Sequence, residues 1–206
     1  MFPPLPLPQP SPPEFILSFS SLSKKVRTLK HVPPHILPLG AETGIILHRI
    51  FERILPLQSQ IETVVAEEVK GTLLADWSKQ VVEIVEKTLQ LPLMAFSLQE
   101  VRQDKMQQEM EFLFSTKNGL MKGYIDLFFE KDGKYYLVDW KTNYLDSYDY
   151  PHLEQAMQEG DYFLQANIYA AALKKYLARF DPRPFEECFG GVCYIFVRAP
   201  ACFFFS

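Results

Sequence analysis

Two aspartates and a lysine have the spacing of a metal-dependent hydrolase. Asp132-Gly133 is favoured as a two-residue turn between antiparallel strands, and apolar segments flank it on both sides. If this turn joins two strands, counting back along both of them places Asp126 directly opposite Asp139. Their Cβ atoms would then be about 5 Å apart on one face of the sheet. Lys141 shares that face because it lies two residues beyond Asp139.

Facing carboxylates destabilise a sheet unless a positive charge compensates them. A divalent cation is one solution, because carboxylate oxygens are the ligands that Mg²⁺ prefers. The alternative is that Lys141 forms a salt bridge with one aspartate while the other points to water. The apolar neighbours favour the metal site: Ile125, Leu127, Val138 and Trp140. The spacing is specific, since a shift of one residue would move either aspartate to the opposite face.

The segments around this hairpin predict the elements that position it. Upstream, one apolar stripe predicts a helix that ends at Pro56: Leu47, Ile50, Phe51 and Ile54. Residues 61–90 indicate further helix, broken at Gly71 and stopped at Pro92. A strand is expected over 109–114, two more over 122–130 and 134–141, a long helix over 153–179 and a buried strand over 191–198. This order indicates an α/β sandwich in which helices flank a central mixed β-sheet.

Five short motifs resemble the PD-(D/E)XK nuclease superfamily, and within it the RecB-type C-terminal nuclease domain. Gly123-Tyr-Ile-Asp126 followed by Val138-Asp-Trp-Lys141 is similar to the D…(D/E)-x-K core. The segment 39–52, which contains His48, resembles the helix that carries the metal-binding histidine of the family. The motifs Glu109-Met-Glu and Gln165-x-x-x-Tyr169 match an upstream acidic position and a Q-x-x-x-Y helix. The resemblance implies a restriction-endonuclease-like fold.

The resemblance also assigns roles to these residues. His48, Asp126, Asp139 and the backbone carbonyl of Trp140 would bind Mg²⁺, while Lys141 would stabilise charge that develops on the phosphate. The remaining catalytic candidates are Glu109, Gln165 and Tyr169. Each has an alternative. His48 could be a histidine at the edge of the core, Glu111 could take the place of Glu109, and the Gln165–Tyr169 pair could be boundary residues.

The implied function is hydrolysis of DNA phosphodiester bonds in double-strand break repair and recombination, with exonuclease and endonuclease activity. The implied partners are DNA, as single-stranded ends from unwound duplex, the helicase part of a RecB-like protein, and RecC- and RecD-like subunits. A different class remains open, a non-catalytic DNA- or subunit-binding module with a nuclease fold. Such a module usually loses its metal ligands or its lysine, whereas this sequence has them all.

Composition sets broader limits. The net charge of −4 does not favour nucleic-acid binding by itself, although basic residues gather at 24–30 and 174–179. The three cysteines are odd in number, which favours a reducing compartment, and we expect the cytoplasm. No apolar run is long enough to span a membrane.

Proline frequency divides the chain into two parts. Prolines concentrate in residues 1–40, which we interpret as a proline-rich linker or tether, and the nuclease domain is expected over 41–206. The family pattern continues beyond Arg198, whereas this chain ends on the apolar segment 199–206. It therefore stays open whether the C-terminal end of the domain is truncated.

Overall fold

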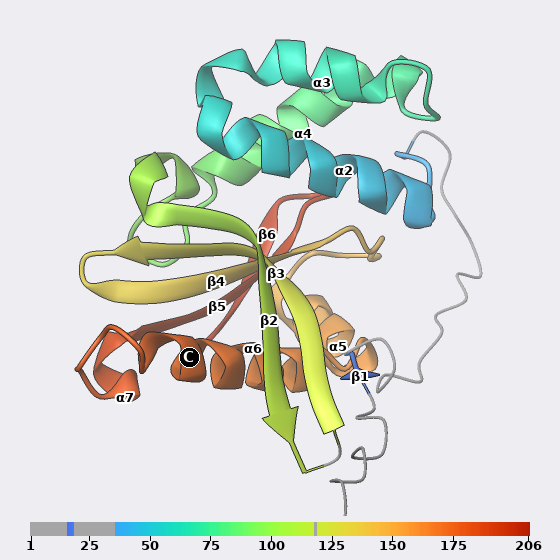
Figure 1. Cartoon of the computed structure of the whole chain (residues 1–206). Coiled ribbons are helices and arrows are strands. Elements are labelled where there is room, and N and C mark those ends of the chain that lie inside the picture. The colour runs from blue at the N-terminus through green and yellow to red at the C-terminus, as the bar shows by residue number, and fades with distance from the viewer. Residues whose placement is uncertain (1–15, 19–35, 118) are drawn as a thin grey trace, which may run out of the picture.

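A six-stranded mixed sheet forms the centre of the molecule (Figure 1). The computed structural model describes residues 16–18, 36–117 and 119–206. Strand order is β1-β3-β4-β5-β6, and β2 pairs with β3 outside that path. The strands are β1 Ile16–Leu17, β2 Met106–Thr116, β3 Gly119–Lys131, β4 Lys134–Lys141, β5 Phe189–Phe196 and β6 Ala201–Phe205. The β1–β3 and β4–β5 pairs are parallel and the others antiparallel, so the expected mixed sheet is confirmed.

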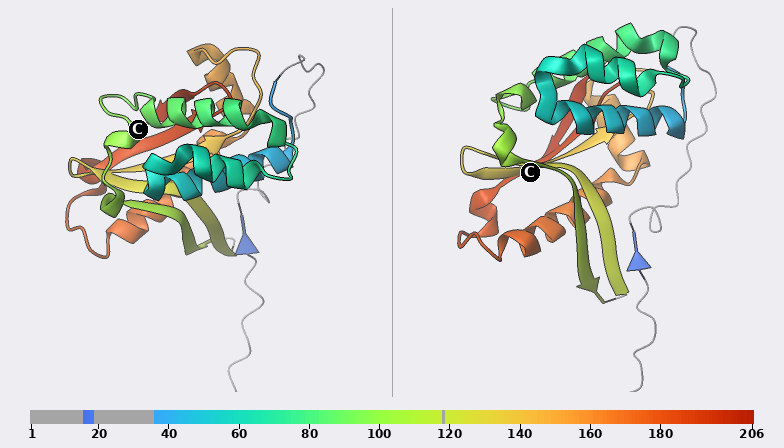
Figure 2. Two further views of the ribbon diagram at one scale, coloured as in Figure 1. Left: turned by 90° about the horizontal axis from the view of Figure 1, so that it is seen from above. Right: turned by 45° about the horizontal axis from the view of Figure 1, so that its top comes forward.

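Helices cover both faces of this sheet (Figures 1 and 2). The helices are α2 Ala41–Ile54, α3 Ile61–Val69, α4 Ser78–Gln90, α5 Tyr150–Glu159, α6 Tyr162–Leu177 and α7 Phe185–Cys188. One hydrophobic cluster joins α2, α3 and α4 to the sheet through residues such as Leu47 and Phe51. A second joins α5 and α6 to the other face through residues such as Leu173 and Tyr194. The expected α/β sandwich is therefore confirmed. Among the described residues, no helix has the length and apolar character that crossing a bilayer requires.

The β3–β4 hairpin has the register that the Asp132-Gly133 turn predicts. Lys131 pairs with Lys134, and the ladder continues to Leu127 and Val138. Both turn residues have positive φ, 51° at Asp132 and 77° at Gly133, as this type of turn requires. The hairpin is fixed from outside by the Arg183 guanidinium, which donates a 2.7 Å hydrogen bond to the carbonyl of Gly133.

The helix expected over 153–179 is wrong as one element, because two helices occupy this segment. α5 ends at Glu159 and α6 begins at Tyr162. Asp161 between them has φ 55°, in the left-handed region that helices cannot contain. A Cβ on Gly160 would lie 2.4 Å from the ring of Tyr162, so the break needs a glycine there. The break gives α6 a helix axis of its own, separate from that of α5.

The C-terminal segment adds a strand that the sequence did not predict. β6 pairs antiparallel with β5, with Tyr194 opposite Phe203. Phe203 also packs at 5.7 Å from the ring of Phe163 on α6, which explains why the segment is apolar. At the other end, most of the expected linker 1–40 and the whole basic group at 24–30 lie outside the described residues.

Strands β2 and β3 both change face at one point. In a regular strand, residues two apart point to the same side. In β3, however, Leu127 packs with the α2 side and Ile125 with the α6 side. In β2, Met106 packs with the α2 side and Met110 with the α6 side, although a regular strand would place both on one side. Glu109 lies between them with φ 46°, rare for a residue with a Cβ. Beyond this bend the hairpin turns out of the sheet toward α6 (Figure 1).

Candidate active site

Asp126 lies where β3 separates from β4. The paired residues of this ladder end at Leu127 and Val138, one step before Asp126 would face Asp139. The carboxylate of Asp126 instead accepts a 2.8 Å hydrogen bond from the backbone N–H of Trp140. The side chain is 12% exposed, so it does not point to water as the salt-bridge alternative requires. The candidate site lies where β3 and β4 separate, next to the bend at Glu109.

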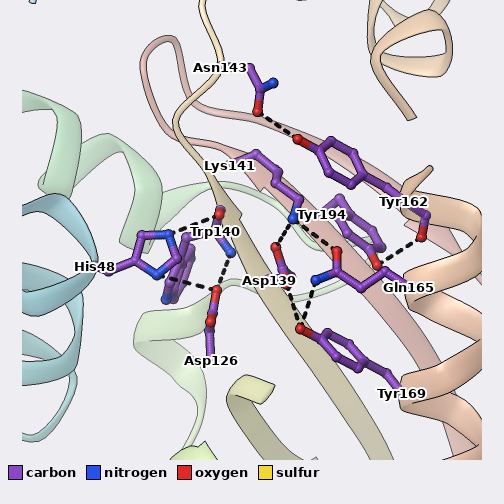
Figure 3. Close-up of polar contacts among 10 residues, drawn as sticks. All are labelled: His48, Asp126, Asp139, Trp140, Lys141, Asn143, Tyr162, Gln165, Tyr169 and Tyr194. Atoms are coloured by element: carbon purple, nitrogen blue, oxygen red, sulfur yellow. Dashed lines mark hydrogen bonds and ion pairs between the residues drawn. The ribbon is translucent and has the colours of Figure 1, made fainter. Parts of the chain in front are cut away.

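Three side chains that can bind a metal converge there: His48, Glu109 and Asp126. Each offers one ligand atom, and these atoms all lie within 4.8 Å of one another. α2 carries His48 toward the point where β3 and β4 separate, and its Nδ1 is 3.6 Å from Asp126 Oδ2 (Figure 3). Its Nε2 donates a 3.1 Å hydrogen bond to the carbonyl of Trp140. His48 therefore points its Nδ1 toward the carboxylate of Asp126.

Burial and mutual repulsion disfavour the negative charges of this cluster. Burial, followed by the charge of Asp139, raises the pKa of Asp126 well above its usual value. Burial also raises the pKa of Glu109, with further contributions from the charges of Glu52 and Asp139. Burial lowers the pKa of His48, which favours the neutral imidazole that binds metals. Two carboxylates, an imidazole and a nearby carbonyl fit a divalent cation in donor chemistry, and a cation would relieve the repulsion.

Asp139 belongs to a second group of side chains, on the α6 side. Its Oδ2 is 2.5 Å from Lys141 Nζ, and its Oδ1 accepts a 3.0 Å hydrogen bond from the Tyr169 hydroxyl. Gln165 connects the other two members, because its Oε1 accepts from Lys141 at 2.9 Å and its Nε2 donates to Tyr169 at 2.8 Å. All four side chains are buried. Gln165 and Tyr169, one turn apart on α6, thus hold Asp139 and Lys141 in a closed ring of contacts (Figure 3).

Two aromatic residues of the site were not predicted. Lys141 Nζ lies 3.9 Å from the ring centroid of Tyr162 and 5.2 Å from that of Tyr194. The Tyr162 hydroxyl donates to the side chain of Asn143 at 3.1 Å. Helix periodicity could have found Tyr162, since it lies three residues before Gln165 on α6. Tyr194 pairs with Asp139 in the parallel β4–β5 register, which requires knowledge of strand order.

The expected site residues lie in one region of the structure, but the carboxylates are grouped differently from the expectation. Glu109, and not Asp139, lies with His48 and Asp126 within ligand distance of one another. Glu111 does not compete for this place, because it is exposed and forms a 2.6 Å salt bridge with Lys122. The site thus has a half on the α2 side whose side chains can bind a metal, and a half on the α6 side that contains the lysine.

Comparisons with known proteins agree with this arrangement. The profile described as PD-(D/E)XK nuclease superfamily matches residues 24–201. The chain is 33% identical over 193 residues to "RecBCD enzyme subunit RecB" of Chlamydia pneumoniae, covering 83% of this chain and 18% of that protein. It is 32% identical over 203 residues to the protein of the same name from Escherichia coli, covering 80% of this chain and 17% of that protein.

The chain thus spans less than a fifth of the length of these curated relatives. The family match covers most of the chain and includes both halves of the site. The chain belongs to the PD-(D/E)XK nuclease superfamily and is related to the nuclease domain of RecB.

Proposed function

We propose that this protein is a Mg²⁺-dependent deoxyribonuclease that hydrolyses phosphodiester bonds of DNA. The observation that carries the proposal is the position of the Lys141 ammonium. It is buried, paired with Asp139, and carried by β4, whose Trp140 contacts both His48 and Asp126 of the His48–Glu109–Asp126 cluster. A fixed cation beside a cluster of metal ligands is the arrangement that stabilises negative charge on a phosphoryl group.

The proposed ligands of the ion are His48, Asp126, Asp139 and the carbonyl of Trp140, with Glu109 as a further carboxylate. When bound, Mg²⁺ supplies positive charge that polarises the phosphodiester and lowers the pKa of a water molecule. Asp139 lies between the two halves, since its charge acts on His48, Glu109 and Asp126 while its oxygens contact Lys141 and Tyr169.

The α6 residues keep the reacting groups in position. Gln165 and Asp139 each accept from Lys141, which leaves one ammonium proton available for a phosphate oxygen. Tyr169 donates to Asp139, and burial together with the charge of Asp139 raises the pKa of its hydroxyl, so it stays a donor at neutral pH. We therefore assign Gln165 and Tyr169 as positioning residues, and Lys141 as the residue that stabilises charge on the phosphate.

The biological setting that we propose follows from the relatives. These relatives are named as RecBCD enzyme subunits, and this chain corresponds to under a fifth of their length. We propose that the chain acts with a RecB-like helicase part and RecC- and RecD-like subunits. Its substrates would be the single-stranded ends that unwinding produces, in double-strand break repair and recombination. With this we propose a cytoplasmic location, the expectation from the cysteine content.

The test is digestion of end-labelled linear single-stranded DNA with and without Mg²⁺. Cleavage should require the ion, and Lys141→Ala should reduce kcat by about 100- to 1000-fold, the usual cost of losing one aligned charge-stabilising group. Lys141→Arg should not restore activity, because a guanidinium is planar and bulkier than the ammonium that lies 3.9 Å from the Tyr162 ring centroid. Exposed Lys134, in the same strand, is the control: Lys134→Ala should leave kcat unchanged.

Two results would contradict the proposal. Near-normal cleavage by Lys141→Ala would mean that another group stabilises the phosphate. Tight DNA binding by the wild-type chain with no cleavage at any Mg²⁺ or Mn²⁺ concentration would indicate a non-catalytic binding module.

A further inference from the structure

A groove of about 460 Å³ runs between α6 and the distal part of β2, beyond the bend at Glu109. Figure 1 shows the β2–β3 hairpin passing α6 there. We refer to it as the β2–α6 groove. It is lined from β2 by residues 110–115, and from α6 and the turn after it by Ala172, Lys175, Tyr176 and Arg179.

The groove begins at the candidate active site. Met110, at one end, directly follows Glu109 of the metal-ligating cluster. The ring of Phe112 packs edge-on against Tyr169, 5.9 Å between centroids, and Tyr169 donates to Asp139. Phe112 in turn stacks on Phe114, also at 5.9 Å. A line of aromatic rings therefore leads from Asp139 into the groove.

The opposite wall of the groove, formed by α6 and the turn after it, carries basic side chains along the same direction. Tyr169, Ala172, Tyr176 and Arg179 are spaced by three or four residues, so they lie along one face of α6 and the turn that follows it. Lys175 lies on this wall too, with Nζ 5.7 Å from the ring centroid of Phe114. Lys175 and Arg179 are exposed and form no salt bridge with another described residue. Glu111, the acidic residue of the lining, is neutralised by Lys122 at 2.6 Å.

We propose that the β2–α6 groove binds single-stranded DNA next to the scissile phosphate. This rests on the function proposed above. Lysine and arginine would contact phosphates, while the half-buried rings of Phe114 and Tyr176 would contact bases. Proteins bind single strands without sequence preference through this combination. The aromatic rings favour a single strand over a duplex, whose bases are stacked on each other and closed to side chains.

The length of the groove sets how much DNA it covers. From Ala172 to Arg179, the α6 wall of the groove is about 10 Å long at about 1.5 Å per residue. A stacked strand rises about 3.4 Å per nucleotide, so the groove holds about three nucleotides. A substrate of two nucleotides would reach the candidate active site but not Arg179.

The experiment measures binding and cleavage separately. Binding of a fluorescent oligothymidylate of about twelve nucleotides is followed by anisotropy in EDTA, so that no cleavage is needed. Lys175→Ala/Arg179→Ala should weaken binding about tenfold and reduce the slope of log Kd against log salt by about 1.4, which is 0.7 for each lost phosphate contact. Phe114→Leu keeps an apolar side chain but removes the ring, and should weaken binding at least about fivefold.

Lys174→Ala is the matched control. It removes the same charge from the same helix, one residue away, but Lys174 is not in the groove and pairs with Glu186 at 3.2 Å. Its binding and salt slope should remain those of the wild type. With Mg²⁺, the double variant should raise KM for the twelve-nucleotide strand, whereas Lys174→Ala should not.

The inference is overturned if the double variant and Lys174→Ala bind the oligothymidylate equally well. It is also overturned if duplex DNA or polyglutamate of equal length displaces the fluorescent oligothymidylate as well as unlabelled oligothymidylate does. Failure of the proposed function has a different signature. In that case wild-type protein does not cleave, while the loss of binding in the groove variants persists.

Discussion

The carboxylate of Asp126 and the backbone N–H of Trp140 form a 2.8 Å hydrogen bond where β3 leaves β4. In a continuous antiparallel ladder, a backbone carbonyl would accept that hydrogen bond. The carbonyl of Trp140 meanwhile accepts from His48. One residue of β4 therefore holds both Asp126 and His48, through its two backbone groups.

This relationship predicts the effect of Asp126→Asn. The amide oxygen can still accept from Trp140, so the hydrogen bond survives, but the buried charge is removed. Because burial and the charge of Asp139 raise the pKa of Asp126, its ionised form opposes folding at neutral pH. In EDTA at pH 8 we expect Tm to rise by a few degrees. Cleavage should be lost, since a carboxylate ligand is lost.

Differential scanning calorimetry with and without Mg²⁺ checks this prediction. The wild type should gain Tm when Mg²⁺ is added, whereas Asp126→Asn should gain little. Equal stabilisation of both proteins by the ion would show that Asp126 is not a ligand.

Tyr162 provides a test of how Lys141 is held. The ammonium lies 3.9 Å from the ring centroid, within the range of a cation–π interaction, which is stronger at a desolvated site. Tyr162→Leu should lower kcat about tenfold with little change in KM, because the lysine loses its position but DNA contacts remain. Tyr162→Phe keeps the ring and should retain most activity, although it loses the hydrogen bond to Asn143.

Steady-state kinetics on one single-stranded substrate separate the two cases. If Tyr162→Phe lost as much activity as Tyr162→Leu, the hydroxyl and not the ring would be the important group.

The Asp181–Arg183 pair predicts a pH dependence of stability. Hydrogen bonding to the Arg183 guanidinium lowers the pKa of Asp181, whose side chain is 7% exposed. Arg183 also donates to the carbonyl of Gly133 and so fixes the hairpin that carries Asp126 and Asp139. A lowered pKa means that this stabilisation is complete above about pH 4, the unfolded value, and is lost as pH falls through the folded value.

Urea unfolding between pH 7 and pH 2 tests this dependence. The difference in unfolding free energy between wild type and Asp181→Asn should be largest at neutral pH and shrink in acid. Asp146→Asn, at an exposed position, is the control and should follow the wild type throughout. A constant difference between wild type and Asp181→Asn would show that protonation of Asp181 does not weaken the pair.

The features that the sequence predicted correctly are those that short, continuous segments determine. The Asp132-Gly133 turn has one preferred geometry, and this alone fixed the register of β3 against β4. Helix α2 followed from its apolar stripe in the same way. In both cases the information lies within about thirty residues of chain.

Features that depend on distant contacts were missed. β6 exists because Phe203 packs on α6 and pairs with Tyr194, neither of which its own sequence reveals. At the bend near Glu109, the inward-facing residues of both β2 and β3 switch to the other side of the sheet. The residue pattern of either β-strand alone therefore does not predict the bend. Because of that bend, Glu109 and not Asp139 joins His48 and Asp126. The distribution of carboxylates within the site could therefore not be read from spacing.

The ion pair between Asp139 and Lys141 leads to the last prediction. Two facing carboxylates alone would predict that Asp139→Ala stabilises the apo protein. The structure reverses this expectation, because Asp139 is the partner of buried Lys141 and accepts from Tyr169. Removing one member of a buried pair leaves an uncompensated charge and costs about 3–5 kcal/mol. Asp139→Ala should therefore be inactive and also less stable.

A second variant separates these two effects. Asp139→Ala/Lys141→Met removes both charges and should recover most of the lost Tm, while cleavage stays at background. Asp139→Asn keeps an acceptor for Tyr169 and Lys141, so it should fold better than Asp139→Ala, yet it lacks the charge needed at the metal site. Thermal unfolding in EDTA and cleavage in Mg²⁺ are measured on all three variants. If Asp139→Asn cleaved DNA at the wild-type rate, the charge of Asp139 would not be needed for hydrolysis. If the double variant were no more stable than Asp139→Ala, the unpaired Lys141 would not be the cause of the instability.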